Sequence, residues 1–508
     1  VQTPTLALIV RREEEIRKFT PREYWGITAK LQGFMSTWRD GGKNAQTFDR
    51  NKAEEILKKL QGKPAVLTKV ERQRKITPPP AAYDLTELQR DANKKYAYSA
   101  KETLSLMQSL YERHKLLTYP RTDSRYISQD VVTTLPERLR SCMVDEYKPL
   151  AQEIYRNKPL KTKYLVNDAK VTDHHAIIPT GVPARNLTDN ERKVYDLVVR
   201  RFIAAFYPDC EISTTTVLGK VDKVDFKVTG KQILKPGWRV VFGAEQKDSD
   251  AEPSDEEGVL PDFVKGESGP HKPTLGEKWT QPPKPYTEAT LLRAMETAGK
   301  LVDNDELRDA LKENGIGRPS TRAAIIETLF KRNYIRKERK NLFPTATGVE
   351  LIDTIQEELL KSAELTGLWE KKLRQIERGT YEARTFLEEL KLMVHQVVIN
   401  VLSDQTGRTI TIEQAAPEKP QAEKEPKGKK TRKPRAKKEK TPGQPESTTV
   451  PVKPVCPICK KGSILRGKTA YGCSEYKDGC TFRMDYATYG EGLSDEELVK
   501  VISGIGKD

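Results

Sequence analysis

The segment from residue 406 to residue 455 constrains the fold most, because it cannot contribute to a hydrophobic core. Between Lys419 and Lys440 it consists almost wholly of Lys, Arg, Glu, Pro, Gly and Ala. Nothing in such a composition offsets the conformational entropy that is lost when a chain becomes ordered. The sequence therefore predicts a disordered linker that joins a large N-terminal region to a short C-terminal domain.

The C-terminal domain carries four cysteines at the spacing of metal ligands. Cys456 and Cys459 form a C-x2-C pair, and Cys473 and Cys480 follow as C-x6-C. Four thiolates with a turn-forming first pair suit tetrahedral Zn²⁺ better than they suit free thiols. The domain also has too few apolar residues to fold without such a crosslink. We predict a zinc ribbon with these four ligands.

Length and composition indicate a basic protein of several domains. The chain has 508 residues, and its 89 Lys and Arg against 73 Asp and Glu give a formal net charge of +16. This charge favours a polyanionic partner. A charged fraction of 32% points to a soluble protein, and no run of about 18 apolar residues could span a membrane. Six cysteines, four of them clustered, fit a reducing compartment better than a disulfide framework.

Residues 119–121, Tyr-Pro-Arg, have the composition of a phosphate-transfer site. A phenol is a poor nucleophile at neutral pH because its reference pKa is about 10. It becomes useful where positive charge holds the developing phenolate and the electrophile, and the guanidinium of Arg121 suits a phosphodiester. Pro120 favours an extended Tyr119, so that the hydroxyl can be presented outward. The motif alone leaves open a second interpretation, a tyrosine beside a structural arginine.

Capping and periodicity predict the elements around Tyr119. Ser99 opens a capping box, and the helix that follows is expected to end near His114. Residues 116–118 then read as a short strand that delivers Tyr119 to an edge. Other expected elements are a helix over 11–18, a strand over 22–31, a helix opened by Thr188, and strands within 211–243 that include residues 238–241.

Five blocks in a fixed order give the chain a specific resemblance. They are Asp-Leu-Thr-Glu-Leu-Gln-Arg-Asp-Ala-Asn at 84–93, Tyr-Pro-Arg-Thr-Asp-Ser-Arg at 119–125, Asp-His-His-Ala-Ile-Ile-Pro-Thr at 173–180, Pro-Pro-Lys-Pro-Tyr-Thr-Glu-Ala-Thr-Leu at 282–291 and Asn-Gly-Ile-Gly-Arg-Pro-Ser-Thr-Arg at 314–322. With these blocks, the region before the linker resembles the type IA DNA topoisomerases. The form of the motifs is closest to the bacterial topoisomerase III branch.

The resemblance implies an active site. Tyr119 would attack one DNA strand and take its 5′ phosphate, leaving a free 3′ hydroxyl that later reverses the reaction. Arg121 would be the partner of the scissile phosphate, and His174 occupies the position of the family's phosphate-contacting histidine. Adjacent side chains on a strand face opposite ways, so His174 and His175 should not bind one metal ion, and one of them should face the site. We also expect DNA contacts from Gln89, Asp123, Arg125, Arg318, Thr321 and Arg322.

The resemblance also implies the fold, a multidomain α+β toroid in which a β-rich arch carries the tyrosine domain. The expected parts are 1–21 as the start of a helical base, 22–71 and 209–281 as the legs of the arch, 72–208 as the tyrosine domain, 282–405 as the base with a winged-helix-like helix and hairpin, 406–455 as the linker, and 456–508 as the zinc ribbon and tail. In the base, the turn at Gly315 and Gly317 could bind a backbone phosphate or could be a packing turn.

One part that the family carries is not found in the sequence. Family members have a TOPRIM domain with an Asp-x-Asp-x-Glu strand end that holds Mg²⁺, and residues 248–250 and 303–305 read as solvated charge, not as replacements. We therefore expect a fragment that lacks its Mg²⁺ site and is inactive alone. Two functions stay open. The first is an isomerase that needs no ATP and relaxes or decatenates DNA; the second is a non-catalytic fragment or paralogue that only grips single-stranded DNA.

The expected partners follow from these interpretations. Single-stranded DNA is the expected substrate, a helicase or a single-strand binding protein is considered as a further partner, and no membrane is involved. The expected location is the bacterial cytoplasm, at the nucleoid. The basic linker would add weak DNA affinity or serve only as a tether. Tyr471, Tyr476, Phe482 and Arg483 would either stack on bases or form the core of the ribbon.

Overall fold

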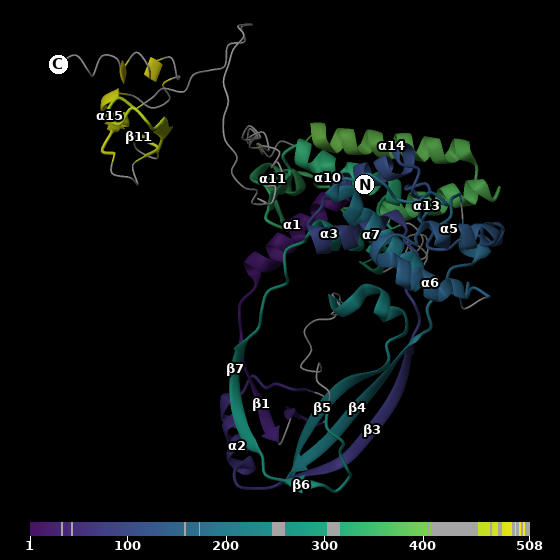
Figure 1. Ribbon diagram of the computed structural model, residues 1–508, viewed down its shortest axis with the longest axis vertical. Coiled ribbons are helices and arrows are strands. Elements are labelled where there is room, and N and C mark those ends of the chain that lie inside the picture. The colour runs from purple at the N-terminus through teal and green to yellow at the C-terminus, as the bar shows by residue number, and fades with distance from the viewer. Residues whose placement is uncertain are drawn as a thin grey trace, which may run out of the picture. The chain divides into compact units, whose positions relative to one another are not determined.

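The computed structural model describes residues 1–31, 34–41, 44–156, 159–171, 173–245, 260–301, 315–403, 407, 456–467, 470–475, 480–489, 493, 497–498 and 501–502. The chain forms two compact units, Val1–Lys419 and Pro420–Asp508 (Figure 1). The predicted linker lies outside the described residues apart from Gly407, and so do the acidic stretches 248–250 and 303–305.

Two separate stretches of the first unit form a seven-stranded antiparallel sheet with the order β6-β3-β4-β5-β2-β1-β7. Its strands are β1 (Glu23–Leu31), β2 (Phe34–Arg39), β3 (Ala65–Thr77), β4 (Cys210–Val221), β5 (Val224–Lys235), β6 (Ser268–Gly269) and β7 (Lys272–Trp279). Figure 1 shows β3, β4 and β5 side by side. Thr77 at the end of β3 pairs with Cys210 at the start of β4, so residues 78–209 leave the sheet and return to it at neighbouring points. This sheet confirms the β-rich arch and the strand expected over 22–31.

Helix α2 (Arg50–Leu60) packs against β1 and β7 of the sheet. Alternating side chains of the strands, among them Ile27, Trp38 and Phe226, are buried together with Leu60. Asp49 caps the helix, because its carboxylate accepts a hydrogen bond from the backbone N–H of Lys52 at 3.1 Å.

The strand expected at residues 238–241 is wrong, because this segment is 3-10 helical, within a span Gly237–Glu245 that is kinked at Gly243. Gly237 has a φ of +51°, and a Cβ there would lie 2.4 Å from the carbonyl oxygen of Asp209. Trp238 then donates its Nε1–H to the carbonyl oxygen of Thr77 at 3.1 Å. A short apolar run has no periodicity that separates a strand from a buried helical turn, which explains the failed prediction.

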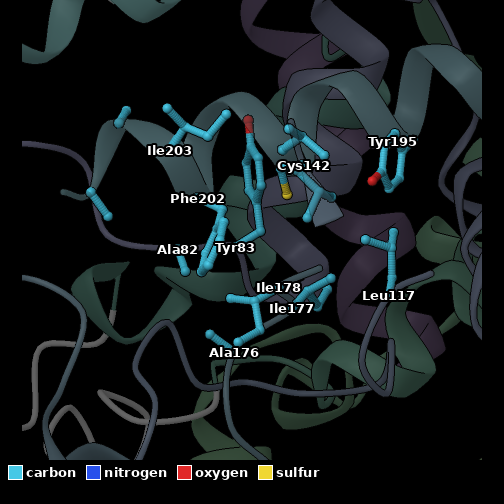
Figure 2. Packing of buried hydrophobic residues seen from close by; sticks show 14 of the residues in the cluster. Ala82, Tyr83, Leu117, Cys142, Ala176, Ile177, Ile178, Tyr195, Phe202 and Ile203 are labelled. Atoms are coloured by element: carbon cyan, nitrogen blue, oxygen red, sulfur yellow. The ribbon is translucent and has the colours of Figure 1, made fainter. Parts of the chain in front are cut away.

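Residues 78–209, called the tyrosine-bearing region below, are mainly helical. The helices are α3 (Leu85–Tyr96), α4 (Ala100–Gln108), α5 (Leu135–Ser141), α6 (Lys148–Arg156) and α7 (Asp189–Ala204). The helix predicted from Ser99 is confirmed, and it runs on from α4 into a π-helical turn, Ser109–Arg113, with His114 as its cap. The capping box of Thr188 and Glu191 at α7 is also confirmed. Figure 2 shows Phe202 and Ile203 of α7 in one core with residues from outside the helices, including Tyr83, Leu117, Ala176, Ile177 and Ile178.

The helical base combines the N-terminal helix with residues after the sheet. Its elements are α1 (Gln2–Lys18), α8 (Glu288–Glu296), α10 (Pro319–Lys331), β8 (Ile335–Glu338), β9 (Asn341–Pro344), α11 (Ala346–Thr354), α12 (Glu358–Lys361), α13 (Glu364–Glu377) and α14 (Ala383–Leu402). The order of α10, β8 and β9 confirms the expected helix and hairpin. Helix α1 begins at Gln2, well before the predicted residue 11, because Leu6 and Ile9 are buried in the core where α1 packs on α10, β9 and α11.

The second unit contains a three-stranded antiparallel sheet of β10 (Ile464–Arg466), β11 (Ala470–Cys473) and β12 (Arg483–Asp485), followed by α15 (Tyr486–Tyr489). Tyr471 and Phe482 are buried in its core beside the cysteines, while Arg483 is exposed and pairs with Asp485. Of the two roles considered for the aromatic residues, the structure shows the core role for Tyr471 and Phe482. Tyr476 lies outside the described residues.

Candidate active site and metal centre

The motifs around Tyr119 and His174 lie side by side in the tyrosine-bearing region. The backbone N–H of Thr118 donates to the carbonyl oxygen of Ile178 at 3.0 Å, and that of Thr180 donates to Leu116 at 2.8 Å. The expected strand over 116–118 is reduced to a single bridge between Leu117 and Pro179. The ladder cannot continue because proline has no N–H to donate, and prolines stand at 120 and 179.

The backbone after Tyr119 presents alternate side chains to solvent. Pro120, Thr122 and Ser124 are buried, whereas Arg121 and Asp123 are exposed. This period of two places Tyr119, Arg121 and Asp123 on the same outward side of an extended segment. The hydroxyl of Thr122 donates to the carbonyl oxygen of His174 at 2.8 Å and so ties the two motifs together. The residues next to the two motifs, Leu117 and 176–178, belong to the core that Figure 2 shows.

The ring of Tyr119 is half-buried between two other rings. Its centroid lies 4.4 Å from that of His174, at an interplanar angle of 44°. Tyr111 meets it edge-on at 5.6 Å and 82°. Tyr111 comes from the π-helical turn, a kind of irregularity that is frequent at functional sites.

The two adjacent histidines have different surroundings. His174 is exposed and touches the ring of Tyr119. His175 is partly buried, its Nδ1 lies 2.8 Å from the carbonyl oxygen of Ala176, and burial lowers the pKa of its imidazole. The structure thus brings His174 against the tyrosine ring.

A hollow of about 430 Å³ opens beside Tyr119. It is lined by Tyr119, Ser128, Asp168, Val171, Asp173, His174 and His175. Asp168 is held in place because its carboxylate accepts a hydrogen bond from the backbone N–H of Gln129 at 2.8 Å. The motif reading did not point to Ser128 or Asp168, since neither belongs to a recognisable block.

Arg125 faces acidic groups inside the protein. Its Nε donates to Asp84 at 2.6 Å, and its Nη2 lies 3.5 Å from both Glu87 and Glu296. Burial opposes the charged guanidinium, but these three carboxylates outweigh burial and raise the pKa of Arg125. Glu296 belongs to α8, so Arg125 connects the tyrosine motif to the helical base.

The other residues expected to contact DNA divide into buried and exposed ones. Gln89 is fully buried and its Nε2 donates to the carbonyl oxygen of Ala100 at 2.9 Å. Arg322 is 1% exposed and donates to the hydroxyl of Thr86 at 2.9 Å. In this conformation neither side chain reaches the surface. Arg318 and Thr321, at the start of α10, are exposed.

The glycine turn before α10 is explained by packing. Gly315 has a φ of +61°, and a Cβ there would lie 2.2 Å from the carbonyl oxygen of Met295. The next residue, Ile316, donates its backbone N–H to the same carbonyl at 2.7 Å. Only glycine fits so close to α8, which supports the packing interpretation of this turn.

The four cysteines of the second unit are arranged as a metal centre. Their sulfur atoms all lie within 4.8 Å of one another, with 3.7 Å between Cys456 and Cys480 and 3.4 Å between Cys459 and Cys473. A tetrahedral site with Zn–S bonds of about 2.3 Å requires sulfurs about 3.8 Å apart. Backbone N–H groups of Lys461 and Gly462 lower the pKa of Cys459 to about 6, which favours a thiolate ligand. The donor set and its geometry therefore fit Zn²⁺.

No helix in the described part of the chain is long and apolar enough to cross a membrane.

Comparisons with known proteins identify the family of the chain. Residues 1–388 match the profile of the family described as DNA topoisomerase. DNA topoisomerase 3 of Bacillus cereus is 45% identical over 413 residues, which are 79% of this chain and 56% of that protein. DNA topoisomerase 3 of Bacillus subtilis is 42% identical over 417 residues, 80% of this chain and 57% of that protein.

A solved structure agrees with the fold as well. Full-length topoisomerase I of Thermotoga maritima is similar with a TM-score of 0.59 and 26% identity, over 79% of this chain and 62% of that one. The matched region thus spans little more than half of the curated relatives' length. With a family match over most of its residues, the chain belongs to the type IA DNA topoisomerases, in the branch of DNA topoisomerase 3.

Proposed function

We propose that this chain carries the nucleophile of a type IA topoisomerase that breaks, passes and rejoins single-stranded DNA without ATP. The observation that carries the proposal is the placement of Tyr119. It stands on the outward side of the motif with Arg121, and its ring contacts His174.

The reaction is a transesterification that balances without a redox partner. The phenol oxygen of Tyr119 attacks the phosphorus of a DNA phosphodiester, a new O–P bond forms, and the bond from phosphorus to the 3′ oxygen breaks. The phenol proton ends on the departing 3′ oxygen, which becomes a hydroxyl. The 5′ phosphate stays on Tyr119, and attack by the 3′ hydroxyl reverses each step.

Arg121 and His174 are proposed to act on the phosphate. The guanidinium of Arg121 is exposed beside the tyrosine and can pair with two phosphate oxygens as charge develops on them. His174, held by its contact with Tyr119 and by the bond from Thr122 to its carbonyl, can donate to a third oxygen. Arg318, Thr321, Asp123 and Arg125 stay proposed contacts of the strand.

The proposal assigns Zn²⁺ to the four cysteines, where it would supply a structural crosslink. For Mg²⁺ the described residues offer no group of three carboxylates at ligand distance, the four cysteines being the metal-like cluster found there. We therefore derive no step of the reaction through Mg²⁺. We further propose that a helicase or a single-strand binding protein supplies the single strands. The proposed location is the nucleoid of a bacterium.

A chimaera tests the nucleophile. Residues 1–388 of this chain replace the matching region of the Bacillus cereus relative, and the product is mixed with a labelled single-stranded oligonucleotide and denatured. We expect a covalent protein–DNA adduct that Tyr119→Phe abolishes while single-strand binding persists. Tyr126→Phe, which removes a neighbouring hydroxyl, is the matched control and should keep the adduct. An adduct that survives Tyr119→Phe would place the nucleophile elsewhere.

A further inference from the structure

The hollow beside Tyr119 is large enough to hold part of the substrate. Its volume of about 430 Å³ lies in the range of small-molecule sites, about 300–1,000 Å³. Tyr119 and His174 line it, and Asp168, Asp173 and Ser128 supply further polar groups. Whatever occupies the hollow is therefore in contact with the group that attacks the phosphate.

The charge of the lining decides which part of a DNA strand can enter. The lining contains two carboxylates and neither lysine nor arginine. A phosphate would be repelled by Asp168 and Asp173, whereas Arg121, which does not line the hollow, can hold it. A nucleobase is uncharged, and its exocyclic and ring N–H groups are hydrogen-bond donors that carboxylates accept.

We propose that the hollow binds the base of the nucleotide whose 5′ phosphate Tyr119 receives, and that it selects guanine over thymine. This inference rests on the proposed nucleophile and adds a base-reading site to it. The Watson–Crick edge of guanine presents two parallel N–H donors, which match the two oxygens of one carboxylate. Thymine presents a single N–H flanked by two carbonyl oxygens, which the carboxylates repel.

The two aspartates have complementary roles in this reading. Asp168 is oriented by the backbone N–H of Gln129, so it is a preorganised acceptor. Asp173 directly precedes His174, so the residue that would accept a hydrogen bond from the nucleobase is adjacent to the residue that would contact the phosphate. The imidazole of His174 and the side chain of Val171 offer flat and apolar surface on which a base can stack.

The test uses the whole chain and binding alone, so it does not depend on cleavage. The probes are tetranucleotides with one variable base followed by three thymidines, each carrying a 3′ fluorophore, with or without a 5′ phosphate. The 5′ phosphate fixes the register, because it mimics the group that Tyr119 would carry. We expect the guanine probe to bind about 5- to 100-fold more tightly than the thymine probe, the discrimination of one good bidentate contact.

Variants locate the preference. Asp168→Asn and Asp173→Asn should bring the ratio of guanine to thymine affinity toward one while the affinity for the thymine probe stays the same or rises. Glu112→Gln is the matched control, because it removes an exposed carboxylate of the same region that does not line the hollow, and it should keep the ratio.

The outcomes separate the two proposals. One outcome is that binding needs the 5′ phosphate but the guanine and thymine probes differ in affinity by less than twofold. This result would overturn the proposed nucleobase site and leave the proposed nucleophile standing. A ratio that persists in both aspartate variants would also overturn the base site, since another surface would then read the base. Equal affinity with and without the 5′ phosphate would count against the phosphate site itself, and the base site would fall with it.

Discussion

Glu288 should be the strongest single connection between the tyrosine-bearing region and the helical base. Its side chain is 3% exposed, and one carboxylate oxygen accepts the backbone N–H of Ala100 at 2.8 Å, at the start of α4. The other oxygen accepts from Lys337 at 2.9 Å. Because that N–H lies in the first turn of α4, no carbonyl of its own helix can take over when the carboxylate is removed.

The cost of Glu288→Ala follows from these contacts. Leaving a buried N–H without a partner costs about 1–3 kcal/mol. The ion pair adds only about 0.5–1 kcal/mol, since the side chain of Lys337 is 29% exposed and water screens it. The sum of about 1.5–4 kcal/mol corresponds to about a 10- to 700-fold easier opening of this interface.

Hydrogen exchange measures that opening directly. Peptides that cover α4 should exchange faster in Glu288→Ala by about the factor given above, provided that exchange follows the opening equilibrium. Glu327→Ala is the matched control, because Glu327 pairs with Lys101 at 2.8 Å across the same two regions but both side chains are more exposed. Its effect should stay within about fivefold. Equal exchange in the two variants would refute the assignment of Glu288 as the main connection.

Three further predictions concern the chemistry, the acid stability and the metal. Arg121→Lys keeps the charge but loses two-point phosphate contact, so cleavage by the chimaera should fall by about 100-fold or more in single-turnover assays. Burial raises the pKa of Glu191, but hydrogen bonds from Ser109 and Thr188 outweigh burial and lower it to about 2. Its stabilisation is therefore complete above the unfolded pKa of about 4.3 and is lost as the pH falls toward 2, so Glu191→Gln should destabilise α7 at pH 7 and have little effect near pH 2 in acid unfolding followed by circular dichroism. Removal of Zn²⁺ should unfold the second unit and leave the first folded, and Cys473→Ser should sharply lower the bound zinc found by elemental analysis.

Local features of the chain were predictable because their causes are local. The N-cap of Ser99, which accepts from the backbone N–H of Glu102, and the capping box of Thr188 and Glu191 depend on residues three positions apart, and both helices begin where expected. The cysteine spacing likewise predicted the cluster that the structure shows. The outward placement of Tyr119 followed from Pro120, whose constraint acts on its immediate neighbour.

Interactions between distant parts of the chain were not predictable from the pattern. Arg322 donates to Thr86, 236 positions away, and is buried there, although the sequence reading placed it on DNA. Arg125 lies near Glu296, 171 positions away. A charged residue in a motif has the same sequence signature whether it meets a ligand or a partner side chain. The surroundings of such residues are fixed only when the chain has folded.

The contacts between the tyrosine-bearing region and the base suit two bodies that must separate. Their apolar cores are separate except at Ala100 of α4, which is buried in the core of the base, and the bonds between the two regions include Glu288 to Ala100, Lys101 to Glu327 and Arg125 to Glu296. Hydrogen bonds and ion pairs can be exchanged for bonds to water at a small net cost, whereas exposing an apolar interface costs about 25 cal/mol for each Å². If strand passage requires the tyrosine-bearing region to move away from the helical base, a polar interface fixes one closed arrangement and keeps the free energy of opening small. Replacing the paired Lys101 and Glu327 by two leucines should therefore slow opening in the exchange experiment, and an unchanged rate would show that these two side chains do not face each other in solution.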